Sequence, residues 1–266
     1  MVDTSSPEPD FDISVPHSAR IWNYWMGGKD NFAADREAGD AFVATYPDIV
    51  TIAKESRRFL IRAVSYLATD AGVSQFLDIG TGLPTMENTH EVAQRAAPHS
   101  RIVYVDNDPM VLVHARALLT NTTAEGVTAY VDGDFHNPEQ IIADAKNVLN
   151  FTKPIAVMFM GVLGHVRTFD EVRSIVARVM AAVPSGSYLV LWDGTEDKAG
   201  DEALEDYEET GAVAYINRTP DQIGRCFEGL EPVEPGLVSI PLWRPNPADV
   251  GSARAVGAYG AVARKP

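Results

Sequence analysis

The sequence predicts an α/β fold, in which helices cover both faces of a mostly parallel sheet. Short apolar runs of about five residues alternate with longer amphipathic segments, which is typical of such a sheet. Glycine or acidic residues follow the ends of the first three runs. The length of 266 residues suits one large α/β domain with an added cap.

The N-terminal part differs from the rest. Residues 1–11 are acidic and rich in proline and serine, so we expect them to fray. From residue 16 to residue 46, short helices joined at Gly27 and Gly28 are expected to form a helical cap. We therefore divide the chain into a tail and cap, residues 1–55, and a ligand-binding domain, residues 56–266.

The alternating pattern occupies the larger part. Helices are predicted at 56–69, 86–97, 110–119 and 170–183. Strands are predicted at 75–79, 101–105, 127–131, 154–160 and 187–192, and two terminal strands within 230–240 and 255–263. The acidic stretch from Asp193 to Thr210 is either an exposed helix or a mobile insertion. A further helix begins with Thr219 as its N-cap and Pro220 in its first turn.

Composition limits the possible partners. The net charge of −15 opposes the phosphate backbone of nucleic acids, so we expect no nucleic-acid partner. Cys226 is the only cysteine, which rules out an intrachain disulfide and a cysteine-based zinc cluster, and we assign no metal ligands. No apolar run is long enough for a membrane span and no signal peptide begins the chain. These features predict a cytoplasmic protein with no membrane partner.

Three strand ends form the most informative pattern. The run Asp78-Ile79-Gly80-Thr81-Gly82 lies where the first strand turns toward a helix, and its glycines let the backbone approach a ligand closely. Asp106 ends the second strand, with Asn107 beside it, and can accept the hydroxyl hydrogens of a ribose. Asp134 ends the third strand and can receive an adenine amino group, while Phe135 can pack on the ring. Together these residues predict an adenosine-type ligand.

Each of these residues also has a purely structural interpretation. Gly80 and Gly82 can serve only a tight turn, Asp106 an Asx-turn or a helix cap, and Asp134 a cap for the next segment. Their recurrence at three successive strand ends favours the ligand.

Two ligands compete for this position. NAD requires a pyrophosphate seat with the pattern G-x-G-x-x-G, and here Thr85 occupies the last position and Pro84 lacks an amide hydrogen. Asp78, directly ahead of the loop, suits a cationic amino group better than a pyrophosphate. This favours the methionine end of S-adenosylmethionine.

Several motifs resemble a bacterial family of largely uncharacterised S-adenosylmethionine-dependent methyltransferases. The resemblance covers nearly the whole chain and is carried by the runs Ser18-Ala19-Arg20, Gly27-Gly28-Lys29-Asp30-Asn31-Phe32, Gln75-Phe76-Leu77-Asp78-Ile79-Gly80-Thr81-Gly82-Leu83-Pro84-Thr85, Val103-Tyr104-Val105-Asp106-Asn107-Asp108-Pro109, Pro184-Ser185-Gly186-Ser187-Tyr188-Leu189 and Thr219-Pro220-Asp221-Gln222-Ile223.

The resemblance implies a class I methyltransferase fold, a Rossmann-like sheet of seven strands with the last one antiparallel. It also implies ligand contacts: the loop with Asp78, Gly80, Thr81 and Gly82 around the methionine moiety, Asp106 and Asn107 at the ribose, and Asp134 with Phe135 at the adenine. Pro84 stands where the wider superfamily has a third glycine, so close packing of the following helix is not implied.

The chemistry is expected beside the fourth strand. Gly161 follows that strand and should border the sulfonium, and His165 is our candidate general base, its alternative role being to hold a loop. Tyr24 is a second catalytic candidate and could line an acceptor cavity with Trp22 and Trp25; ordinary core packing is the alternative.

Three basic residues and the cysteine could also lie near the site. Lys29 or Arg20 could hold the cofactor carboxylate or an anionic acceptor. The alternative for Lys29 is a position in a solvated turn. Arg57 is expected on the surface, with a carboxylate contact as its alternative. Cys226 has no evident base nearby, so we expect it to be buried in packing.

These expectations favour an S-adenosylmethionine-dependent methyltransferase that methylates an oxygen or nitrogen of a small molecule. A non-catalytic S-adenosylmethionine sensor is the first alternative, because the sequence has no strict catalytic motif. An NAD-linked oxidoreductase is the second.

Overall fold

The computed structural model of the protein describes residues 12–84, 87–118 and 121–266. The tail at 1–11, Thr85 of the glycine loop motif, Met86 of the predicted second helix and Leu119 of the predicted third helix lie outside the described residues. Within them, one sheet has the strand order β3-β2-β1-β4-β5-β8-β6, and β7 also pairs with β8. The strands are β1 (Gln75–Ile79), β2 (Arg101–Asp106), β3 (Val127–Asp132), β4 (Ala156–Met160), β5 (Tyr188–Gly194), β6 (Glu231–Pro232), β7 (Val238–Ser239) and β8 (Ala258–Arg264).

The strand order determines where a ligand can bind. β1 to β5 are all parallel, and the chain proceeds outward from β1 in both directions, to β2 on one side and to β4 on the other. In such a sheet the crevice lies at the carboxyl ends of the strands where the order reverses, which here is the end of β1. The predicted parallel α/β sheet is confirmed.

The number of strands differs from the seven that the resemblance implies. β8 runs antiparallel to β5, as implied, but the described residues contain eight strands. β6 pairs with Ala263 and Arg264, and β7 pairs with Tyr259 and Gly260, along the edge of β8 that β5 leaves open. β6 and β7 thus share the place of one edge strand, which a turn at residues 233–237 interrupts.

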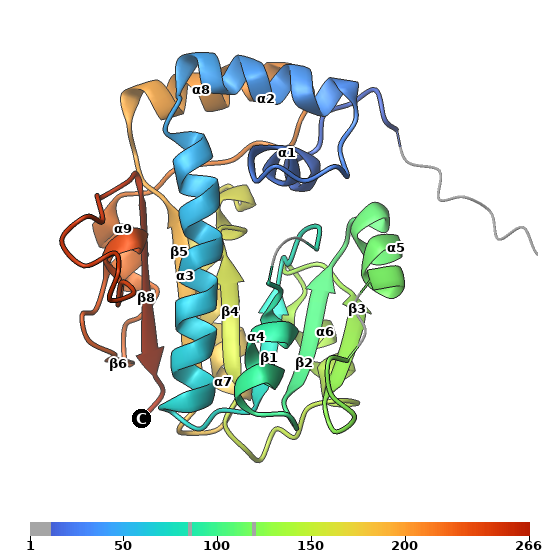
Figure 1. Ribbon diagram of the computed structural model, residues 1–266, viewed down its shortest axis with the longest axis vertical. Coiled ribbons are helices and arrows are strands. Elements are labelled where there is room, and N and C mark those ends of the chain that lie inside the picture. The colour runs from blue at the N-terminus through green and yellow to red at the C-terminus, as the bar shows by residue number, and fades with distance from the viewer. Residues whose placement is uncertain (1–11, 85–86, 119–120) are drawn as a thin grey trace, which may run out of the picture.

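Successive side chains of a strand point to opposite faces of the sheet, and helices cover both faces. Phe76 on β1 packs in one cluster with α3 (Ile49–Thr69) and α4 (Thr89–Ala96), which lie in front of the sheet in Figure 1. Leu77, the next residue, packs in a second cluster with α6 (Pro138–Ala145) and α7 (Phe169–Ala182) on the opposite face. α5 (Pro109–Leu118) connects β2 to β3.

Several helix boundaries differ from their predictions. α3 begins at Ile49 instead of residue 56. α4 begins at Thr89 instead of residue 86, because the side chain of Glu91 accepts from the backbone N–H of Asn88, 2.6 Å away, in a capping box. α6 was not predicted, although Pro138 in its first turn is a typical start signal.

Two C-terminal helices correspond to segments discussed in the sequence: the acidic stretch is a helix, and the helix after Thr219 begins where it was predicted. The acidic stretch after Asp193 forms α8 (Lys198–Glu209), whose N-cap Asp197 accepts from two backbone N–H groups. α9 (Pro220–Arg225) begins as predicted, with the Thr219 hydroxyl accepting from the backbone N–H of Gln222.

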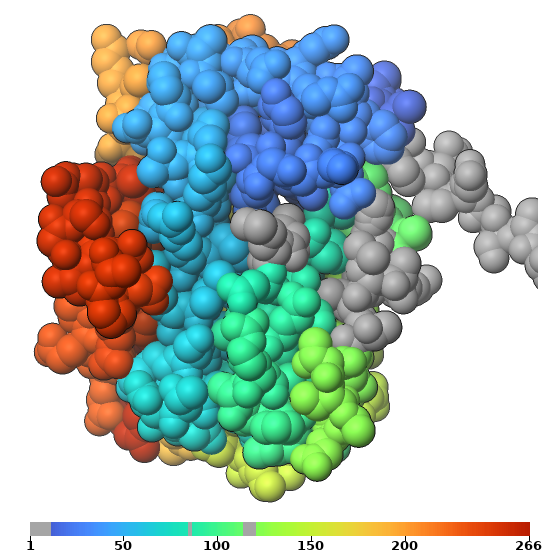
Figure 2. All heavy atoms as spheres, in the orientation of Figure 1, coloured from blue at the N-terminus to red at the C-terminus, as the bar shows by residue number. Residues whose placement is uncertain are grey.

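The N-terminal helices lie across the carboxyl end of the sheet. α1 (Ser18–Trp25) and α2 (Ala33–Thr45) stand at the top of Figure 1, and α2 packs along α8. Figure 2 shows their atoms in direct contact with the upper part of α3. α3 crosses the expected division between residues 55 and 56 as one continuous helix.

Candidate functional site

A cavity of about 310 Å³ opens at the carboxyl ends of β1, β2 and β4. Its lining brings together ten residues that the sequence predicted for the site: Asp78, Gly80, Thr81, Gly82, Asp106, Asn107, Asp134, Phe135, Gly161 and His165. Residues of α1 and α3 also line it, so the cavity lies between the sheet and the N-terminal helices.

The glycine loop is bound tightly to the neighbouring strand. Gly80 has φ +71° and donates its N–H to the carbonyl of Val105 over 2.8 Å, and a Cβ at this position would lie 2.2 Å from the side chain of Val162. Only glycine fits this conformation and this contact together. Gly82 donates its N–H to Oδ2 of Asp106 over 2.8 Å. The loop and the end of β2 therefore form one wall of the cavity.

Asp78 is a buried carboxylate with half of its hydrogen-bonding capacity unused. Its Oδ2 accepts from the hydroxyl of Thr89 over 2.7 Å, whereas its Oδ1 is buried and has no hydrogen-bond partner among the described residues. Burial raises the pKa of Asp78 to about 6, against the hydrogen bond from Thr89 and the charge of Arg57. Such a carboxylate calls for a cationic donor.

Arg57 is the site residue that the sequence placed on the surface. It lies half-buried in the lining of the cavity, and the charge of Asp78 counteracts the lowering of its pKa by burial. Arg57 precedes Leu60 and Val64 by three and seven residues, so helical spacing already put it on the apolar face of α3. Arg58, by contrast, is exposed and pairs with Glu55.

Asp106 and Asp134 differ in their surroundings. Half-buried Asp106 accepts from the N–H groups of Gly82 and Asp108, and burial raises its pKa. Asp134 is exposed, and its Oδ1 accepts from the backbone N–H of His136 over 2.9 Å, which matches its alternative role in a turn. It lines the cavity all the same, beside Phe135.

His165 has one nitrogen committed to the backbone. Its Nδ1 lies 2.9 Å from the carbonyl of Ala214, which can only accept a hydrogen bond. Nδ1 therefore carries the hydrogen, and Nε2 of the neutral ring is left as an acceptor. Burial lowers the pKa of His165, so the ring is neutral at pH 7.

The contacts that hold the segment around His165 were not predicted from the sequence. Arg218 donates to Oδ2 of Asp193 over 3.3 Å and to the carbonyl of Leu163 over 3.0 Å, and the hydroxyl of Tyr215 donates to Asp193. Asp193, at the end of β5, and Arg218 are buried, and burial raises the pKa of Asp193 to about 6. These contacts join residues far apart in the chain, so no local pattern indicated them.

A second, smaller cavity of about 70 Å³ adjoins the first. The two share Ser18, Trp22, His165 and Trp192 in their linings. The second cavity is lined mainly by aromatic and aliphatic side chains of α1, α2, α3, β5 and α8, and none of the described residues in its lining is charged.

Comparison with known proteins identifies the ligand class. The family model for S-adenosyl methyltransferases matches residues 4–266. The chain belongs to this family. It is therefore an S-adenosylmethionine-dependent methyltransferase, and the NAD-linked and sensor alternatives are set aside. No curated protein matches the chain.

Two of the matching solved structures resemble this methyltransferase over nearly its full length. A DUF574 family protein from Streptomyces avermitilis MA-4680 is 42% identical, with a TM-score of 0.90, over 96% of this chain and 100% of that one. A protein from Thermobifida fusca YX, provisionally described as a methyltransferase, is 39% identical, with a TM-score of 0.88, over 98% of this chain and 99% of that one.

Two predicted site residues of the methyltransferase lie away from both cavities. The hydroxyl of Tyr24 donates to Asp40 over 2.8 Å, and Tyr24 lines neither cavity. Lys29 is exposed in the turn after α1 and lines neither cavity. The structure therefore supports neither the catalytic role of Tyr24 nor a cofactor contact of Lys29.

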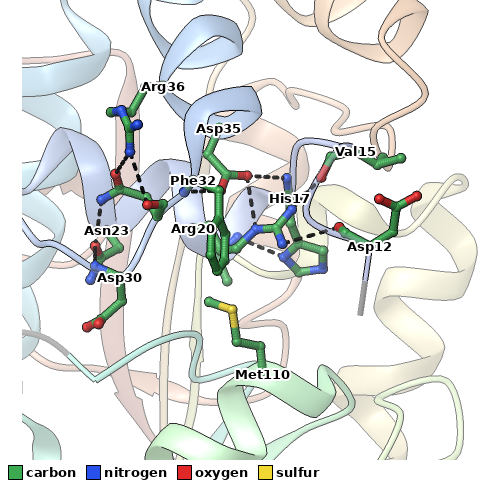
Figure 3. Close-up of polar contacts among 12 residues, drawn as sticks. Asp12, Val15, His17, Arg20, Asn23, Asp30, Phe32, Asp35, Arg36 and Met110 are labelled. Carbon is green, nitrogen blue, oxygen red and sulfur yellow. Dashed lines mark hydrogen bonds and ion pairs between the residues drawn. The ribbon is translucent and has the colours of Figure 1, made fainter. Parts of the chain in front are cut away.

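The motif around Lys29 has a structural role instead. Asn23 accepts from the backbone N–H of Asp30 (Figure 3). It also accepts from the side chain of Asn31, and a Cβ at Gly28 would lie 2.4 Å from the Asn23 side chain. These contacts shape the turn between α1 and α2.

Arg20, another expected anion-binding residue, is buried in the cap. Its Nε donates to Asp35 over 2.9 Å, and its guanidinium also reaches the carbonyl of Val15 (Figure 3). Asp35 in turn accepts from the backbone N–H groups of His17 and Phe32. The Arg20–Asp35 pair therefore joins α1 to α2, and because Arg20 lines neither cavity the structure does not support a ligand contact of Arg20.

Among residues 12–84, 87–118 and 121–266, no helix is both long enough and apolar enough to span a membrane.

Proposed function

We propose that this methyltransferase acts on an oxygen or nitrogen of a small molecule held in the aromatic cavity, and that His165 receives the proton. The observation that carries the proposal is the junction of the two cavities at His165 and Trp192. One cavity has the polar groups that a charged cofactor needs, and the other has none that are charged.

The polar cavity fits S-adenosylmethionine at its amino-acid end. The unpartnered Oδ1 of Asp78 suits the α-ammonium group, and Arg57 suits the carboxylate. Gly80, Thr81 and Gly82 offer close backbone approach to the methionine chain.

The adenosine end has its own residues. We propose that Asp106 and Asn107 contact the ribose, Asp134 and Phe135 the adenine, and Gly161 the region of the sulfonium, because all five line the polar cavity. When bound, S-adenosylmethionine supplies an electrophilic methyl group.

The chain itself would contribute position, exclusion of water and a base. We propose that the N-terminal part of the chain, in its described residues 12–55, acts as the cap expected from the sequence, because α1 and α2 line the aromatic cavity from above the sheet. His165 Nε2 is free to accept a proton from the acceptor, since Nδ1 is held by Ala214. Water exclusion and alignment account for the rest of the rate enhancement.

The cofactor assignments are tested by calorimetry with S-adenosylhomocysteine. Asp106→Asn removes the charge that binds the ribose hydroxyls, and we expect roughly 10- to 100-fold weaker binding. Asp132→Asn is the matched control, because Asp132 ends β3 in register with Asp106 but is exposed and outside the cavity. Undiminished affinity of Asp106→Asn would overturn the assignment.

The role of His165 is tested with His165→Gln and a mixed small-molecule extract as acceptor source. We expect the release of S-adenosylhomocysteine to slow by about 10²- to 10⁴-fold, with unchanged affinity for S-adenosylhomocysteine. Because burial lowers the pKa of His165, the wild-type rate should stay on its plateau below pH 6.5. A variant that keeps the wild-type rate would show that His165 only supports the loop.

A further inference from the structure

We propose that the methyl acceptor is a neutral phenol with a single ring and a second oxygen atom, and that its phenolic oxygen is methylated. This inference rests on the proposed function and narrows its acceptor. Four features of the aromatic cavity carry it: size, ring lining, absence of charge, and two buried polar atoms.

The volume limits the acceptor to one ring. At roughly 10–15 Å³ for each water-sized atom, a cavity of about 70 Å³ holds about five to seven such atoms. Six ring carbons and the second oxygen fill this space when the phenolic oxygen lies at the junction with the larger cavity, so a fused two-ring acceptor does not fit.

The lining favours a flat aromatic ring. Trp22 lies edge-on to Trp25 and to Trp192, with ring centroids 5.6 and 5.9 Å apart, and Trp25 lies 5.3 Å from Phe42. Such rings offer both faces and edges to a further aromatic ring, for which these arrangements are favourable.

The charge pattern disfavours ionic acceptors. None of the described residues that line the cavity is charged, so neither an ammonium nor a carboxylate group finds an ionic partner to replace its hydration, and the rings offer an ammonium group only a cation–π contact. The net charge of −15 also disfavours the approach of anions. A phenol is neutral at pH 7 and, unlike a neutral amine, gains from a base that takes its proton during transfer.

Two buried polar atoms call for a second oxygen on the ligand. Trp192 and Tyr207 both line this cavity, and the Nε1 of Trp192 and the hydroxyl of Tyr207 are buried without a hydrogen-bond partner among the described residues. An indole N–H can only donate, so it requires an acceptor atom such as a carbonyl, ether or hydroxyl oxygen. A buried polar group without a partner costs free energy, which such a ligand would restore.

The reaction balances without a further reagent. The phenolic O–H bond breaks and its proton passes to Nε2 of His165. The oxygen forms a bond to the methyl carbon, while the bond from that carbon to sulfur breaks and its electron pair stays on sulfur. The products are an aryl methyl ether and S-adenosylhomocysteine.

The test measures binding to the full chain saturated with S-adenosylhomocysteine, by tryptophan fluorescence and calorimetry at pH 7. The probe is resorcinol, whose ring carbons and second oxygen make seven atoms, compared with phenol, 4-hydroxybenzoate, tyramine and 2-naphthol. We expect it to bind at least tenfold more tightly than the two charged probes and 2-naphthol, and several-fold more tightly than phenol. With S-adenosylmethionine, mass spectrometry should detect its methyl ether.

Two variants test the polar atoms. Trp192→Phe and Tyr207→Phe should each weaken binding of the probe by about five- to tenfold. Tyr207 lines only the aromatic cavity, so Tyr207→Phe should also leave the affinity for S-adenosylhomocysteine unchanged. Trp243→Phe is the matched control, because the Nε1 of Trp243 is also buried without a partner among the described residues, yet Trp243 lines neither cavity. Equal effects of Trp192→Phe and Trp243→Phe on probe binding would contradict the assignment of Trp192.

The outcomes separate this inference from the proposed function. Binding of S-adenosylhomocysteine with no binding of the phenol, or with tighter binding of a charged probe or 2-naphthol, overturns the inference alone. If S-adenosylhomocysteine itself does not bind, the cofactor assignments fall and the inference falls with them.

Discussion

Asp78→Asn is expected to make the ligand-free protein more stable and the cofactor complex weaker. Burial raises the pKa of Asp78 from its usual 3.8 to about 6, so the folded protein disfavours the ionised carboxylate. At about 1.4 kcal/mol for each pKa unit, ionised Asp78 costs roughly 3 kcal/mol of folding free energy above pH 6. An uncharged asparagine removes this cost.

The sign of the pH dependence follows from proton binding. Between pH 3.8 and about 6 the folded state holds the proton of Asp78 more tightly than the unfolded state, so stability falls as pH rises through this window. The advantage of Asp78→Asn over wild type should therefore be roughly 1.5 kcal/mol at pH 5 and reach roughly 3 kcal/mol at pH 8. Asp193 titrates in the same range, but it is present in both proteins and cancels in the difference.

The assay is urea unfolding of both proteins at pH 5 and pH 8, with Asp132→Asn as the exposed control. The same proteins are titrated with S-adenosylhomocysteine, where Asp78→Asn should bind at least tenfold more weakly, because the ammonium loses its ionic partner. A variant less stable than wild type at pH 8, or a stability difference independent of pH, would refute the reasoning. The opposed changes in stability and affinity distinguish a ligand carboxylate from a merely structural one.

Three further outcomes are expected. Gly80→Ala should lower the free energy of unfolding by about 2–4 kcal/mol, because a Cβ would meet Val162 at 2.2 Å and φ is +71°. The control Gly211→Ala has φ +86° but open space around it, so it should cost only about 1 kcal/mol in the same urea titration. Equal losses in the two variants would contradict the contact with Val162. Asp35→Ala should cost about 3–5 kcal/mol in thermal or urea unfolding, since it leaves the Arg20 charge buried without its partner, and an unchanged stability would show that the ion pair is dispensable. Burial raises the pKa of Cys226 to about 12, so iodoacetamide at pH 8 should label it only after denaturation; rapid labelling of the native protein would show an accessible thiol.

The local sequence determined much of the central sheet. The run Gln75–Ile79 forms β1 with the predicted bounds, because five apolar or buried positions followed by a glycine turn specify a short strand and its end. The polar residues at the ends of β1, β2 and β3 also reached one cavity as expected, since parallel strands present their carboxyl ends at the same edge.

Three local signals in the sequence match features of the structure that the predictions did not include. Pro138 marked the start of α6, Asn88 and Glu91 set the start of α4, and the helical spacing of Arg57 from Leu60 pointed it toward the core. Each of these signals is local, and each had a competing interpretation that only the packed neighbours decide.

The sequence by itself determined the α/β pattern and the positions of the residues around the cofactor cavity, because both depend on periodicity and on strand ends. Only the tertiary structure decided that Tyr24, Lys29 and Arg20 lie away from both cavities, and that His165 is held through Ala214. The aromatic cavity likewise exists only in three dimensions, since its walls come from α1, α2, α3, β5 and α8. The physical reason is that side-chain burial and hydrogen bonding between distant segments depend on how the helices pack over the sheet, which no local pattern of residues encodes.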